Sequence, residues 1–63
     1  MTQKELLYIE DAIGHEENII SVCNETLNYL EDEALVSFLS KEVKKHMTMK
    51  EKLLKVLEDK SNE

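Results

Sequence analysis

Apolar residues recur at alternating three- and four-residue steps through the first half of the chain. This spacing places one stripe of side chains along one side of a helix, as in the contact line between bundled helices. The pattern predicts a helix over residues 2–30, with Thr2 as the N-cap and Glu5 positioned to complete a capping box. The stripe consists of Leu6, Ile9, Ile13, Glu16, Ile20, Cys23, Leu27 and Leu30, of which Glu16 is the charged member.

The stripe stops near Leu30 and resumes in a different phase, so the sequence predicts a break at residues 31–33. Asp32 can cap the helix that follows, for which we expect residues 33–59, with a frayed tail at 60–63. No glycine or proline marks the break, so one continuous helix remains the alternative to a hairpin. The predicted inner stripe of the second helix is Leu35, Leu39, Glu42, His46, Met49, Leu53 and Val56, flanked by Val36, Val43, Leu54 and Leu57.

The apolar positions are more numerous than a contact between two helices requires. A second stripe flanks the first one on the N-terminal helix, at Tyr8, Ala12, His15, Ile19, Val22, Thr26 and Tyr29. A chain of this length buries only about 60% of the surface that its unfolded form exposes. We therefore predict an all-α fold in which residues 1–63 form one helical-hairpin domain. Two such hairpins are expected to pair as a homodimer into an antiparallel four-helix bundle.

The composition favours helices, and the charge disfavours one class of partner. The chain has no proline, one glycine and 35% charged residues, a composition typical of helices. The net charge of −6 divides into −7 for residues 1–32 and +1 for residues 33–63, which disfavours nucleic acid as a partner. There is no long apolar run and no signal-peptide pattern, so we expect a cytoplasmic protein, complete from Met1, with no membrane contact. The single cysteine, Cys23, is expected to be a buried, inert thiol.

Four polar residues in or beside the stripes are candidates for chemistry: Glu16, Glu42 and His46, with His15 nearby. In a hairpin, Glu16 would lie within one turn of His46, and Glu42 one turn nearer the connection. Two-fold pairing would then gather the carboxylates and imidazoles that hold two iron or manganese ions in helical bundles. The alternative is that these residues lie at the bundle edge, paired with lysines. The second interpretation is favoured, and no catalytic, cofactor-binding or metal-binding residue is predicted.

Three segments together resemble half of a ferritin-like bundle, in particular the small spore-coat proteins of the coat F type. They are IEDAIGHEENII, YLEDEAL and SFLSKEVKKHMTMKEKLL. The resemblance implies a helical hairpin that pairs into a bundle, a structural rather than catalytic role, and an association with spores. Ferritin-like metal sites use Glu and His three residues apart, whereas Glu42 and His46 are four apart. The resemblance therefore does not carry over that metal geometry.

A shorter stretch is similar to the Leu-Ser-Gln-Glu-Leu-Asp motif of the stage-zero E family, small helical-hairpin phosphatases that act on sporulation response regulators. Leu39, Ser40 and Glu42 match this motif, while Lys41 and Lys44 replace its Gln and Asp. The activity is therefore not carried over. The leading prediction is a non-catalytic structural or interaction protein that assembles with itself or with other coat or cytoplasmic proteins. The alternatives are a ferritin-like iron or manganese binder with ferroxidase chemistry, and a phosphatase-like regulator of a sporulation response regulator.

Overall fold

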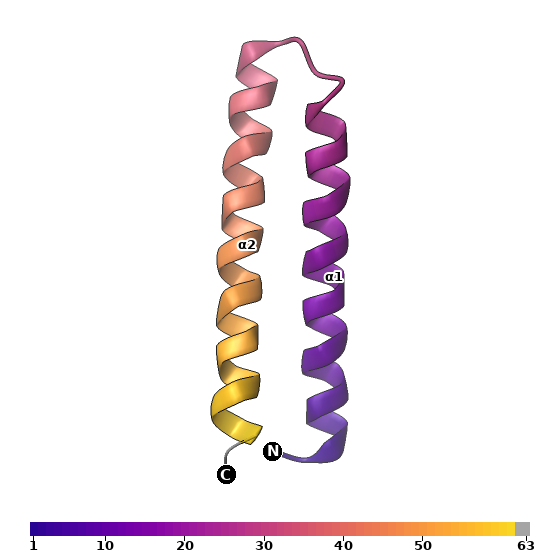
Figure 1. Ribbon diagram of the computed structural model, residues 1–63, viewed down its shortest axis with the longest axis vertical. Coiled ribbons are helices and arrows are strands. Elements are labelled where there is room, and N and C mark those ends of the chain that lie inside the picture. The colour runs from indigo at the N-terminus through magenta and orange to yellow at the C-terminus, as the bar shows by residue number, and fades with distance from the viewer. Residues whose placement is uncertain (62–63) are drawn as a thin grey trace.

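A computed structural model describes residues 1–61 and shows two antiparallel helices (Figure 1). Helix α1 spans Gln3–Leu27 and helix α2 spans Glu33–Ser61. The beginning of α1 and the end of α2 lie together, and the connection lies at the opposite end. The chain therefore folds as the predicted all-α hairpin and not as one continuous helix. Neither helix, over the described residues, is long and apolar enough to cross a membrane.

Both predicted caps are present. The Oγ1 atom of Thr2 accepts a hydrogen bond from the Glu5 N–H at 3.1 Å, and Oε1 of Glu5 accepts one from the Thr2 N–H at 2.9 Å. This capping box satisfies donors that the first turn of α1 would leave unpaired. The Thr2 N–H is also the main reason why the pKa of the Glu5 carboxyl is lowered. At α2, Oδ1 of Asp32 accepts from the Leu35 N–H at 3.0 Å.

The connection forms without any left-handed residue. Helix α1 ends at Leu27, three residues before the expected boundary, where the N–H groups of residues 28 and 29 donate to the carbonyls of Glu25 and Thr26 at 3.1 and 3.0 Å. Such three-residue bonds tighten the end of a helix and use its last carbonyls. No residue within 1–61 has a positive φ. The chain can therefore reverse here without the glycine whose absence left the break uncertain.

Helix α2 begins at residue 33 as expected and extends two residues beyond the expected boundary, to Ser61. Lys60 lies in its last turn, where a positive charge interacts favourably with the helix dipole. Residues 60–63 were expected to fray. Residues 60 and 61 are helical, and residues 62–63 lie outside the described residues.

On α1, the residues turned toward α2 are those of the predicted inner stripe, but on α2 part of that stripe was wrong. The buried or half-buried residues of α2 are Val36, Leu39, Ser40, Glu42, Val43, His46, Lys50, Leu53 and Leu57. Three positions of the predicted stripe are instead largely exposed: Leu35 at 52%, Met49 at 47% and Val56 at 43%. Alternate positions of the α2 contact are thus shifted by one residue from the predicted stripe.

Lys50 gives a physical reason for this shift. Two adjacent rows on α2 compete for the interior, and each contains one charged residue, Glu42 in the predicted row and Lys50 in the observed one. The long aliphatic stem of a lysine can be buried while its amine remains at the surface. The amine of Lys50 lies 3.3 Å from Oε2 of Glu17. This rotation buries Val43, which is 7% exposed, and leaves the Glu42 side chain half-buried beside Lys45.

The hairpin has a very small core of its own. Ile13 and Val43 are the buried hydrophobic residues of the described chain, and no side chain within 1–60 is less than 2% exposed. The molecule measures 47 × 15 × 11 Å and has a radius of gyration of 14.6 Å, compared with about 11 Å for a compact domain of this length. An isolated hairpin with so little buried apolar surface is expected to be marginally stable.

Candidate functional site

Two of the four predicted polar residues meet between the helices, near the middle of α1. Glu16 comes from α1 and His46 from α2, and Oε2 of Glu16 lies 2.5 Å from Nδ1 of His46. Their side chains are 11% and 24% exposed, so the contact is largely shielded from water. An ionised carboxylate can only accept hydrogen bonds. When Glu16 is ionised, Nδ1 of His46 therefore carries the proton that joins the two groups.

The sequence places this pair beside the most buried layer of the hairpin. Glu16 and His46 each follow a buried hydrophobic residue, Ile13 or Val43, by three positions, and residues three apart lie on the same helix face. No buried side-chain nitrogen or oxygen of the described chain lacks a hydrogen-bond partner. Separating a largely buried polar pair would leave each group unsatisfied. The contact therefore favours the one alignment of α1 and α2 in which these residues are level.

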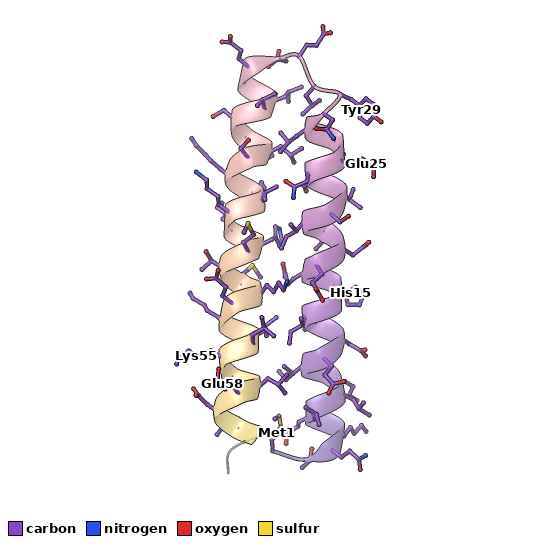
Figure 2. All side chains as sticks on the ribbon, in the orientation of Figure 1. Met1, His15, Glu25, Tyr29, Lys55 and Glu58 are labelled. Carbon is purple, nitrogen blue, oxygen red and sulfur yellow. The ribbon has the colours of Figure 1, made fainter. Side chains whose placement is uncertain are left out.

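The other two predicted residues do not join this pair. Oε1 of Glu42 lies 3.3 Å from Nζ of Lys45, one turn further along α2. His15 is exposed and points away from α2 (Figure 2). Over the described part of the chain, no three His, Cys, Asp or Glu side chains gather closely enough to hold a metal ion. Within one hairpin, Glu16 and His46 thus form a shielded pair, and Glu42 and His15 lie apart from it.

Glu16 can hold the His46 imidazole in one orientation. The groups beside this imidazole decide whether it could act as a catalytic base. In nucleophilic catalysis the oriented base must lie next to a hydroxyl or thiol. The hydroxyls of Thr26 and Thr48 instead donate to helix carbonyls one turn earlier, at 2.8 and 3.1 Å. Cys23, predicted to be buried, is a free and half-buried thiol two turns beyond Glu16. These contacts favour a structural role for the Glu16–His46 pair.

A larger feature of the surface is its content of exposed apolar side chains. The most exposed of them lie near the connection, Tyr29 at 78% and Phe38 at 61%. At the open end, Tyr8 and Val56 line a shallow pocket together with Glu5 and Ile9. Apolar surface concentrated on so small a protein is typical of an interaction site. The remaining large apolar residues of the two helices that are at least one-third exposed are Leu7, Ile19, Val22, Leu35, Met47, Met49 and Leu54.

Sequence reasoning missed Phe38, which belongs to neither predicted stripe. Its heptad row continues as Lys45 and Lys52, so the row reads as a solvated face. The signal that could have found it is local, since Phe38 lies three residues from Leu35 and thus on the same side of the helix.

Comparisons of this chain with protein-family models, with curated proteins and with solved structures found no match. The fold, the buried pair and the exposed apolar surface are therefore the observations from which a function can be argued. Together they define a two-helix hairpin with a thin interior and many exposed apolar side chains.

Proposed function

We propose that this protein is a non-catalytic structural or interaction protein that acts as a homodimer, with two hairpins forming a four-helix bundle. The observation that carries the proposal is the contrast between a thin interior and an apolar exterior. Ile13 and Val43 are the buried hydrophobic residues, whereas Tyr29 and Phe38 remain more than half exposed. Removing apolar surface from water contributes roughly 25 cal/mol per Å². Pairing would thus supply the stability that one hairpin lacks.

Assembly beyond the dimer forms a second part of the proposal. A four-helix bundle keeps the outer, charged surfaces of its helices available to further partners, such as other coat or cytoplasmic proteins. The resemblance to small spore-coat proteins supports a structural role of this kind.

Sedimentation equilibrium and thermal melting over a wide range of protein concentrations test the homodimer. We expect a species of twice the chain mass of 7.4 kDa and a melting temperature, followed by circular dichroism, that rises with concentration. A species of 7.4 kDa at every concentration, with a constant melting temperature, would refute the proposal.

Binding of iron or manganese requires a different arrangement of the same residues. Glu42 would have to leave Lys45 and join Glu16 and His46, because a carboxylate–imidazole pair supplies fewer ligands than a bundle site uses. Adding Mn²⁺ or Fe²⁺ while following the melting temperature separates the two functions. We expect no shift. A rise that the His46→Gln variant abolishes would favour metal binding.

A further inference from the structure

We infer that the second copy docks on one particular side of the hairpin, antiparallel to the first, so that the connection of each copy lies beside the open end of the other. This side, which we call the dimer face, is the one that carries Tyr8 and Val56. The inference rests on the proposed homodimer and goes further, because it states which residues of the two copies meet.

The pocket at the open end shows which rows of side chains share the dimer face. Tyr8 and Val56 line this pocket together, so they lie on the same side of the hairpin. Residues seven apart lie on the same side of a helix. The row Tyr8, His15 and Val22 and the row Leu35, Glu42, Met49 and Val56 therefore both belong to the dimer face. Five of these seven residues are apolar, and each of the five is at least 43% exposed.

The opposite side of the hairpin, which we call the polar side, is less suited to a second copy. Its row on α1 contains Glu10, Glu17 and Asn24. The Lys50 amine pairs with Glu17 on this side, at 3.3 Å. Met47 and Leu54 are the main exposed apolar residues of α2 on this side. Met47 belongs to the polar side because the buried Val43 row separates it from Glu42. Docking there would bury carboxylates, and burying a charge without a partner is costly.

The charges on α2 identify the occupant as a second copy of this chain. Residue 47 is the midpoint of α2, Glu33–Ser61, and Glu42 and Lys52 lie five positions before and after it. A two-fold axis that crosses α2 at this midpoint brings each residue opposite the one equally far on the other side. The facing pairs are Phe38 with Val56, Glu42 with Lys52, Lys45 with Met49, and, towards the helix ends, Leu35 with Asp59. An acid thus meets a base, an aromatic ring meets an aliphatic side chain, and no like charges face each other in these pairs.

Helix α1 is compatible with the same axis. Since Tyr8 lies level with Val56 and Glu16 contacts His46, the axis crosses α1 within residues 15–17. With the axis at residue 17, the facing pairs on α1 are Tyr8 with Thr26, Ala12 with Val22, and His15 with Ile19. With the axis at residue 17, the position given by the Tyr8–Val56 level, uncharged or apolar residues therefore meet along α1.

This alignment also accounts for Glu42, the acid in an otherwise apolar row of α2. Its carboxylate already contacts Lys45 of its own helix, and Lys52 of the second copy would approach it from across the interface. One polar position in an apolar contact fixes the alignment of helices at some cost in stability. Glu42 therefore specifies how the two copies are aligned.

Exchanging the charges at 42 and 52 tests this alignment. In a Lys45→Ala background, which removes the contact of Glu42 within its own chain, Glu42→Lys and Lys52→Glu each place like charges across the interface. We expect each single variant to weaken dimerisation about tenfold or more, and the double variant to recover to within about threefold of the background. Lys55→Glu is the matched control, because Lys55 points away from α1 (Figure 2). It should leave dimerisation unchanged.

Disulfide trapping separates failure of this inference from failure of the proposed homodimer. In Cys23→Ser proteins, a mixture of His15→Cys and Ile19→Cys chains should give a covalent dimer on oxidation. A mixture of Glu10→Cys and Asn24→Cys chains, equally spaced about the axis but on the polar side, should not. Trapping on the polar side, or no recovery in the charge exchange, while sedimentation still shows a dimer would overturn the inference alone. A monomer throughout would overturn both proposals.

Discussion

The two sides of the hairpin are built from the same two helices and differ in the residues next to the shared interior. On the dimer face, the flanking positions carry exposed apolar groups such as Tyr8 and Val56, and one acid, Glu42. On the polar side, the flanking positions carry Glu10 and Glu17, and Glu17 holds the Lys50 amine. An apolar stripe wider than one helix contact thus need not be buried within one chain. The exposed apolar groups of α2 lie on both sides, and the side without Glu10 and Glu17 is the one better suited to a second copy.

The largest expected effect comes from placing a charge on the dimer face. Phe38→Asp removes an aromatic contact and buries an unpaired carboxylate in both copies, so we expect dimerisation to weaken by about 2 kcal/mol or more. Met47→Asp makes a comparable change on the polar side and should alter it by only about 0.5 kcal/mol. Sedimentation equilibrium measures both variants, and circular dichroism reports whether the helices persist after dissociation. Equal effects from the two variants would remove the distinction between the two sides.

The next largest effect, on the free energy of unfolding, is expected at the Glu16–His46 pair, which lies between the two sides. Glu16→Ala leaves the His46 imidazole without its partner in a shielded place, so the free energy of unfolding should fall by about 1–3 kcal/mol. Glu17→Ala is the matched control, because the Glu17 side chain is 56% exposed and surface ion pairs contribute about 0–1 kcal/mol. Urea denaturation at one protein concentration compares the two variants. A larger loss for Glu17→Ala would mean that the polar side is more buried than described.

A smaller effect is expected at Gly14, on the outer part of the polar side. A Cβ atom added at Gly14 would meet nothing within 4 Å, so Gly14→Ala should stabilise α1 by about 0.5–1 kcal/mol through a less flexible unfolded chain. The melting temperature should rise while the dimerisation constant stays the same. Weaker dimerisation would show that the second copy approaches α1 closely at Gly14, and hence on the polar side.

The smallest effect concerns pH, at the open end of the dimer face. The pKa of Glu5 is lowered in the folded chain, mainly by the Thr2 N–H. Ionised Glu5 therefore stabilises the fold above the unfolded-state pKa, and this contribution is lost as pH falls through the folded-state pKa. The melting temperature should exceed that of Glu5→Gln slightly at neutral pH and approach it in acid. In a Thr2→Ala background the difference should disappear, and its persistence would assign it to another partner.

Much of the fold could be predicted from the sequence because its determinants are local. The helical spacing, the capping box of Thr2 and Glu5, and the Asp32 cap each depend on residues a few positions apart. The expectation that Glu16 lies near His46 also followed, since antiparallel helices of similar length fix which residues are level. The rotation of α2 could not be predicted, because it depended on which of two similar rows faces α1. Leu35, Met49 and Val56 of the predicted row are largely exposed, whereas Glu42 is half-buried.

The sequence by itself thus determined two helices, the place of the break and the excess of apolar positions. Only the tertiary structure decided how α2 is rotated. This rotation buries Val43, brings the half-buried Lys50 to Glu17 and leaves the half-buried Glu42 beside Lys45. The physical reason is that periodicity counts apolar residues and does not weigh the charged residue in each row. Burying Lys50 is tolerable because its stem is long and Glu17, on the other helix, receives its amine. That contact exists only once the two helices have been brought together.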